Sequence, residues 1–181
     1  MARGFILAVD VEATCDDQGR IPRGEMEIIE IGAVLLDAKL DQVGEFQTFI
    51  RPFKNPVLTP FCIELTSISQ DEINNAPTVH EAFRALGAWL QTFQPFSWCS
   101  WGDYDQKQFK QDSVRTGAPW PFPGPHFNAK QLYADKTLGR KLGLAEAIED
   151  QGLEWVGTHH RGIDDARNVA RILQRVLSKN G

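Results

Sequence analysis

An apolar run near the start of the chain, Phe5-Ile-Leu-Ala-Val-Asp-Val-Glu-Ala13, ends in two acids. A short apolar run of this kind is typical of a strand that is buried on both faces. Side chains alternate along a strand, so Asp10 and Glu12 point to the same side. Two such carboxylates repel each other unless a cation lies between them. The run therefore predicts a central strand that ends in a divalent-metal site; a strand end fraying into water is the alternative.

The following segments predict a mixed α/β sheet. Strands are expected over Glu27–Leu36 and Gly44–Ile50, and their short connections to the first strand predict antiparallel hairpins. Two later strands, Phe96–Trp101 and a short one at Phe127–Ala129, alternate with helices, as parallel strands do.

Helix-start signals mark much of the remaining chain. Ser69 and Thr78 each precede a glutamate three residues on, which is the pattern of a capping box. Helices are expected to start at Ser69 and to cover Thr78–Phe93, Asp103–Thr116, Leu144–Gln151 and Ile163–Ser178.

Length and composition favour one globular domain over residues 1–181. The chain is 42% hydrophobic and 24% charged, with a net charge of −5. An acidic chain is not a general electrostatic binder of nucleic acid. It is compatible with a nucleic-acid enzyme, because a metal-binding carboxylate cluster itself contributes negative charge.

The termini and cysteines indicate a cytoplasmic setting. The N-terminal residues Met1-Ala-Arg-Gly4 lack the features of a signal peptide, and no apolar stretch approaches a membrane span. The three cysteines, Cys15, Cys62 and Cys99, are far apart and form no CxxC pair. They suggest neither a disulfide framework nor a zinc site, so a reducing compartment is expected.

A second acidic motif, Trp101-Gly-Asp-Tyr-Asp105, closes the fourth strand and opens a helix. Acids are favoured at a helix N-terminus, so we expect Asp103 to cap this helix. Asp105 lies four residues before Phe109 and shares its helix face. Because Phe109 should face the core, Asp105 is expected to point inward beside the sheet.

A third motif, His159-His-Arg-Gly-Ile-Asp-Asp165, leads into the last helix. On a helical projection Asp165 lies roughly 80° from the centre of the apolar stripe, and Asp164 roughly 180° away. We expect Asp165 to meet the acids of the first strand, and Asp164 to be a solvated or capping acid. His160, ordinarily a surface residue, becomes a candidate general base beside an inward-facing acid.

The pattern of carboxylates and one histidine is what two-metal phosphoryl transfer needs. Two divalent ions about 3.5–4 Å apart clamp the scissile phosphate and activate a water. Oxygen ligands suit Mg²⁺ or Mn²⁺.

Five segments occur in one order along nearly the whole chain: Asp10-Val-Glu-Ala-Thr-Cys15, Glu27-Ile-Ile-Glu-Ile-Gly32, Phe61-Cys-Ile-Glu-Leu-Thr-Ser-Ile-Ser-Gln70, Trp101-Gly-Asp-Tyr-Asp105 and His160-Arg-Gly-Ile-Asp-Asp-Ala-Arg-Asn168. In this order the chain resembles the DEDDh (DnaQ-like) 3′–5′ exonucleases of the RNase H-like fold. Within them it most resembles the group of the histone-mRNA 3′ exonuclease and the RNA-interference-enhancing exonucleases. The resemblance implies a metal-dependent enzyme that releases nucleoside 5′-monophosphates from single-stranded RNA 3′ ends, with DNA as a further substrate.

The resemblance also implies roles for individual residues. The ligands of two Mg²⁺ or Mn²⁺ ions would be Asp10, Glu12, Asp105 and Asp165, with His160 as the general base. Thr14 lies where the family positions the terminal nucleotide, and Phe61 and Leu65 lie in the segment that packs against the terminal base. Glu27 and Glu30 stay structural. The extra RNA-binding domain of the histone-mRNA relatives has no counterpart, so stem-loop recognition is not implied.

Two other functions compete with this hypothesis. Asp10-Val-Glu-Ala-Thr14 is similar to the first motif of haloacid-dehalogenase-like phosphatases, although that motif needs Asp where this chain has Glu12 and is followed by parallel βαβ units. A non-catalytic RNA-binding module is the second alternative, with stacking on aromatic residues that are more often core, namely Trp98, Trp101, Tyr104 and Trp120.

Overall fold

A computed structural model describes residues 4–94, 96–137 and 139–178. Residues 1–3, which begin the N-terminal segment discussed above, lie outside the described residues. Within them a five-stranded sheet has the order β3-β2-β1-β4-β5. The strands are β1 (Phe5–Ala13), β2 (Ile28–Leu36), β3 (Gln42–Phe49), β4 (Phe96–Ser100) and β5 (His126–Asn128). β1, β2 and β3 pair antiparallel, whereas β1, β4 and β5 pair parallel. This mixed sheet confirms the predicted fold class.

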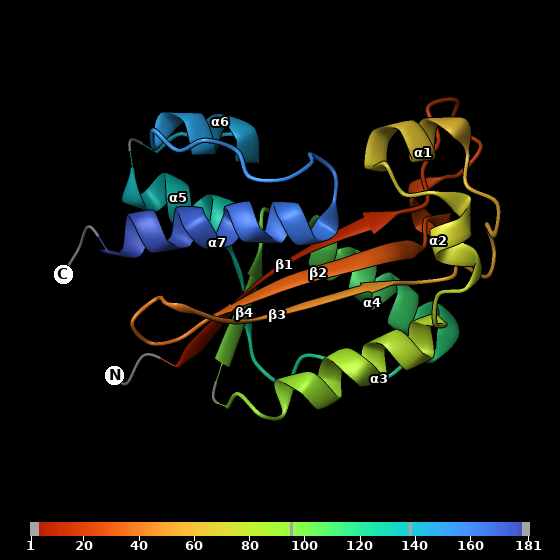
Figure 1. Ribbon diagram of the computed structural model, residues 1–181, viewed down its shortest axis with the longest axis horizontal. Helices are drawn as coiled ribbons and strands as arrows, with labels where there is room; N and C mark the ends of the chain where they lie inside the picture. Colours follow the sequence, from red (N-terminus) through yellow and green to blue (C-terminus); the bar gives the residue numbers. More distant parts are fainter. Residues whose placement is uncertain (1–3, 95, 138, 179–181) are drawn as a thin grey trace.

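Helices cover both faces of the sheet (Figure 1). α7 lies along one face, with α5 and α6 packed beside it, and α3 and α4 lie on the other face. α1 and α2 lie beside the end of β1. The helices are α1 (Pro60–Thr66), α2 (Gln70–Asn74), α3 (Val79–Leu90), α4 (Tyr104–Thr116), α5 (Ala129–Lys136), α6 (Leu144–Asp150) and α7 (Gly162–Ser178). None of the helices in the described part of the chain has the length and apolar character to cross a membrane.

β1 is the central strand of this arrangement. Its middle residues Leu7, Ala8 and Val9 are fully buried. Leu7 and Val9 pack in the cluster shared with α3 and α4, whereas Ala8 packs in the cluster shared with α7. Because side chains alternate, Asp10 and Glu12 continue the α7 side of the strand.

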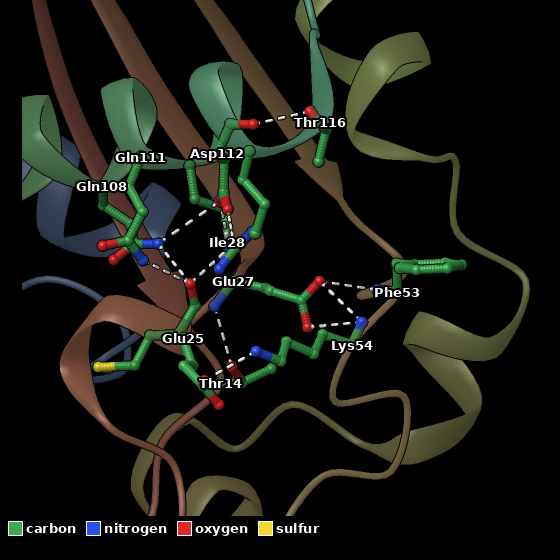
Figure 2. A network of polar contacts seen from close by, with 12 residues as sticks. Thr14, Glu25, Glu27, Ile28, Phe53, Lys54, Gln108, Gln111, Asp112 and Thr116 are labelled. Atoms are coloured by element: carbon green, nitrogen blue, oxygen red, sulfur yellow. Dashed lines mark hydrogen bonds and ion pairs between the residues drawn. The ribbon is translucent and has the colours of Figure 1, made fainter.

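The start of β2 is tied to its surroundings by buried acids (Figure 2). The Glu27 carboxylate accepts hydrogen bonds from the backbone N–H groups of residues 53–55 at 2.7–2.9 Å. The Glu27 N–H donates to the Thr14 hydroxyl at 3.0 Å, and the Thr14 N–H donates to the Glu27 carbonyl at 2.8 Å. On the other side, Asp112 of α4 accepts from the Ile28 N–H at 2.8 Å. These bonds fix the strand end just beyond Glu12.

Most predicted elements are confirmed, with small shifts at their ends. The capping boxes at Ser69 and Thr78 form. Two helices were not predicted. α1 is a short helix with Thr59 as its cap and Pro60 in its first turn, and α5 has a weakly amphipathic sequence that starts where a strand was expected to end. Short helices with little periodicity depend on tertiary packing rather than on local pattern.

Candidate active site

Asp10 and Glu12 point from β1 toward the start of α7, and burial dominates their electrostatics. Burial raises the pKa of Asp10 well above its usual range, and the charges of Asp105, Asp165 and Glu12 raise it further. Burial, followed by the charge of Asp165, raises the pKa of Glu12 to about 9. In the metal-free protein these carboxyl groups resist ionisation. A cation bound among them would stabilise their ionised forms, so the cluster favours cation binding.

Asp105 enters the same cluster from the first turn of α4. Its side chain is buried as predicted, with 4% of the residue exposed. Its Oδ1 accepts a hydrogen bond from the Val11 N–H at 3.0 Å, between the two acids of β1. Burial raises the pKa of Asp105 to about 6, while the bond from Val11 opposes the rise. The α4 acid is therefore held directly against the central strand.

The prediction that Asp103 caps α4 is wrong. It occupies the N-cap position, but its side chain makes no capping bond and instead accepts from the Asn128 amide at 3.0 Å. Its backbone is not in the extended conformation that usually accompanies a side-chain cap. Asp103 thus links the start of α4 to the residue that caps α5.

α7 and the loop before it bring Asp165 and His160 to Glu12. Ligand atoms of Glu12, His160 and Asp165 lie within 4.8 Å of one another. Burial raises the pKa of Asp165 to about 7, and its buried Oδ1 has no hydrogen-bond partner among the described residues. Burial and the neighbouring His159 lower the pKa of His160, which favours the neutral imidazole.

Asp164 is not the solvated or capping acid that we expected. Its side chain is only 14% exposed and pairs with Arg167 at 2.8 Å. It also accepts from the Thr158 N–H at 2.8 Å, in the loop before the helix. Asp164 therefore fastens this loop to α7, while Asp165 faces the other acids.

The expected substrate residues differ in accessibility. Phe61 and Leu65 are half-buried, four residues apart on α1. Thr14 is 1% exposed, and its hydroxyl accepts from the Glu27 N–H, so this side chain is committed to the fold. Tyr104, which we had weighed only as a stacking residue, is 45% exposed. Burial raises the pKa of the Tyr104 hydroxyl, and the charges of Asp105 and Glu12 raise it further.

The other aromatic candidates divide between core and surface. Trp98 is 1% exposed and belongs to the core cluster beneath the sheet, whereas Trp120 is 43% exposed. Trp101 is half-buried and donates its indole N–H to the Leu142 carbonyl at 3.1 Å. Neither Trp98 nor Trp101 is available as an open stacking surface.

The donor set fits a hard divalent cation. The cluster offers four carboxylates and one imidazole, and the partnerless Asp165 oxygen is the kind of buried acceptor that a cation satisfies. The raised carboxyl pKa values have the same physical origin, namely negative charge gathered in a poorly solvated place. The residues present are therefore suited to Mg²⁺ or Mn²⁺.

A further acid, Glu30, lies beside this cluster, and the sequence analysis left it as a structural residue. Glu30 of β2 lies opposite Glu12 in the strand register and is fully buried. Its charge is among the contributions that raise the pKa values of Asp10, Glu12 and Asp165, after burial. The only sequence signal is an acid inside an otherwise apolar strand, because its contacts come from α7, far along the chain.

Comparisons with known proteins agree with this geometry. The model of the family RNase_T, described as exonuclease, matches residues 7–173. The 3′-5′ exonuclease eri1 of Schizosaccharomyces pombe is 31% identical, covering 97% of this chain and 69% of that protein. The Homo sapiens 3′-5′ exoribonuclease 1 is 32% identical, covering 96% of this chain. The chain spans about half the length of this human relative, 52%.

Solved structures give the same relationship. The nuclease domain of 3′hExo, a DEDDh family member bound to rAMP, superposes with a TM-score of 0.90 at 29% identity, covering 98% of this chain and 93% of that one. A 3′-exonuclease with 3′-end specific recognition of a histone mRNA stem-loop gives a TM-score of 0.88 at 27% identity, covering 99% and 84%. The chain therefore belongs to the RNase_T exonuclease family, among its DEDDh members.

Proposed function

We propose that this protein is a 3′–5′ exonuclease that hydrolyses single-stranded RNA ends to nucleoside 5′-monophosphates. The observation that carries the proposal is the meeting of Asp165 and His160 with Glu12, beside Asp10 and the buried Asp105. Names of relatives support RNA as the substrate, since the human protein is a 3′-5′ exoribonuclease.

The metal ligands in this proposal are Asp10, Glu12, Asp105 and Asp165, holding two Mg²⁺ or Mn²⁺ ions. When bound, the ions supply charge stabilisation for the scissile phosphate and make a water nucleophilic at neutral pH. The chain's own residues hold the site open: Asp105 is anchored to Val11, and Asp165 keeps a free oxygen directed into the cluster. Carboxylate oxygens rather than the imidazole suit Mg²⁺, which leaves His160 for proton transfer.

His160 acts as the general base in this mechanism. Its lowered pKa leaves the imidazole neutral, and it lies within reach of Glu12 and Asp165, beside which the attacking water must stand. It is exposed on the loop before α7, so a proton taken from that water passes on to solvent. A neutral imidazole near this many acids is ready to accept a proton but is not needed as a ligand.

The substrate end lies between α1 and the start of α4. Phe61 and Leu65 offer half-buried apolar surface, and the exposed Tyr104 ring stands beside Asp105. Aromatic and apolar side chains of this kind hold a terminal base by stacking, which tolerates any base. This arrangement favours a single-stranded end over a paired one.

The two alternatives have less support. β2 and β3 run antiparallel to their neighbours, whereas haloacid-dehalogenase-like phosphatases follow their first strand with parallel βαβ units. A non-catalytic binding module does not require an acid cluster with an adjacent neutral imidazole. Neither alternative receives support from the relatives.

A nuclease assay tests the proposal. Single-stranded RNA and DNA oligomers, labelled internally, are incubated with the protein and Mg²⁺ or with EDTA. We expect nucleoside 5′-monophosphates released from the 3′ end, faster from RNA, with no turnover in EDTA. A 3′-terminal phosphate should hinder the reaction, and a 5′ block should not. Asp165→Asn should be inactive, with Asp103→Asn as the charge-matched control. Shortening from the 5′ end, or cutting of a circular substrate, would contradict the assignment.

A further inference from the structure

The first turn of α7 packs directly on the central strands. A Cβ at Gly32 would lie 2.2 Å from the backbone of Gly162, and one at Gly162 would lie 3.2 Å from the Asp10 carbonyl. A side chain at Gly32 would clash with the helix backbone, whereas one at Gly162 would make a tight contact with the Asp10 carbonyl. The helix start therefore lies in the groove between β1 and β2, next to the acid cluster.

Glu30 holds this helix start by charge-assisted contacts. It is fully buried, and its Oε2 accepts from the Gly162 N–H at 3.0 Å and from Arg161 Nε at 3.2 Å. Its Oε1 accepts from the Gln47 amide at 2.7 Å. Both oxygens are thus occupied, so Glu30 is not a further metal ligand but an anchor for the two residues after His160.

His160 has a backbone that needs such an anchor. Its φ is +59°, in the left-handed region, which is unfavourable for a residue with a Cβ by about 1–2 kcal/mol. A residue stays in such a conformation only when its surroundings enforce it. The residues that follow it, Arg161 and Gly162, are the ones bound by Glu30.

We propose that Glu30 is a positioning residue, which holds His160 in its left-handed conformation and so directs the imidazole at Glu12 and Asp165. The proposal rests on the proposed function and adds a role that the sequence motifs do not assign. Glu30 opposes the ionisation of the neighbouring acids, so it does not stabilise the cluster. Its contacts with Arg161 and Gly162 explain why an acid lies at this position.

The kinetic test is a double-mutant cycle between Glu30→Gln and His160→Ala, measured in Mg²⁺ on a single-stranded RNA oligomer. We expect Glu30→Gln to lower kcat by about 10- to 100-fold with little change in KM, as for other residues that orient a catalytic group. In the His160→Ala background the same change should alter kcat by no more than about twofold. A residue that only stabilises the fold would lower activity by the same factor in both backgrounds.

Glu45→Gln is the matched control. Glu45 also pairs with an arginine, since it accepts from Arg167 of α7 at 2.6 and 2.9 Å, but it is an exposed residue of β3 and its bonds go to Arg167 and Gln42. The substitution removes the same charge and the same kind of ion pair. We expect it to change kcat by no more than about twofold.

Amide hydrogen exchange of Gly162 gives a readout that is independent of activity. Glu30→Gln should accelerate this exchange, and Glu45→Gln should not. Unchanged Gly162 exchange, or equal factors in the two backgrounds of the cycle, overturns the proposal. If Glu30→Gln fails to fold, Arg161→Gln, which removes the other contact of Glu30 with this turn, replaces it in the kinetic cycle with the same expected coupling. Absence of turnover by the wild type would refute the nuclease function instead. The exchange data would still show whether Glu30 holds the turn at His160.

Discussion

Helices α4 and α7 both begin beside the end of β1 and bring an acid to it, but they hold these acids in different ways. Asp105 of α4 is bonded to the Val11 N–H and is part of the fold. Asp165 of α7 keeps a buried oxygen without a partner among the described residues, and the neighbouring His160 has a left-handed backbone. The difference indicates that α4 supplies a fixed wall of the site, whereas α7 supplies the groups that remain free for chemistry.

Replacing Asp165 should have the largest effect on activity. We expect Asp165→Asn to abolish turnover, because a proposed metal ligand is lost. The free energy of unfolding of the metal-free protein should not fall, since one charge leaves a cluster of repelling carboxylates. Activity assays and chemical denaturation in EDTA check both expectations. An inactive variant that is also strongly destabilised would show that Asp165 belongs to the fold, as Asp105 does.

His160→Ala should lower kcat by on the order of 10²–10⁴-fold, the usual contribution of a general base. Metal affinity, measured by calorimetry, should be nearly unchanged. Wild-type activity should rise with pH as the imidazole deprotonates, and because burial lowers the pKa of His160, the rise should come at lower pH than for a free imidazole. The neighbouring His159 stacks on Trp155 with ring centroids 3.8 Å apart. Replacing His159 by alanine should lower kcat by at most about tenfold, because the change removes one aromatic contact.

Asp105→Ala should reduce stability as well as activity. The change leaves the buried Val11 N–H without its acceptor, which costs about 1–3 kcal/mol. Asp165→Ala removes the bond from the backbone of His160, which lies on an exposed loop, and should lower the free energy of unfolding by less. Denaturant titrations of both variants in EDTA measure the contrast. Equal destabilisation by the two variants would show that the acids of α4 and α7 contribute equally to the fold.

The pH dependence of stability follows from the raised carboxyl pKa values. In the folded, metal-free protein Asp105, Asp165 and Glu12 ionise near 6, 7 and 9, whereas free carboxyls ionise near about 4. The folded state therefore binds more protons, and stability falls as the pH rises from about 4 to 9. We expect the Tm in EDTA to fall across this range and the gain in Tm from Mn²⁺ to grow with pH. A Tm that rises across the range would contradict the pKa assignments.

The smallest effects are expected at the acids beside the ligands. Asp164→Ala removes the contacts to Thr158 and Arg167, and should lower kcat less than any change at a proposed ligand, because neither contact includes a ligand or His160. Asp103→Ala loses one exposed bond to Asn128 and should have less effect still. Assays alongside Asp105→Ala and Asp165→Ala provide the comparison. An Asp164 variant as inactive as the Asp165 variant would show that the loop before α7 is itself essential.

Much of the fold was predictable, because β1 and α7 bury long, regular apolar patterns. The run Phe5–Ala13 has the bounds that the sequence predicted, and the stripe of α7 placed Asp165 toward the sheet. α1 is short and has no comparable stripe, so its position beside the end of β1 depends on packing. Thr14 was predicted to lie where the terminal nucleotide binds, and only the structure shows that its hydroxyl accepts from the Glu27 N–H.

The sequence by itself determined the central strand, the antiparallel hairpins, and the candidate acids with His160, because strand alternation and helix periodicity are local properties. Only the tertiary structure decided how these groups are held. The bond from Val11 to Asp105, the unpaired oxygen of Asp165 and the contacts of Glu30 with the turn at His160 all join distant segments. The physical reason is that burial and hydrogen bonding depend on which distant segments come into contact, and a local sequence pattern does not predict those contacts.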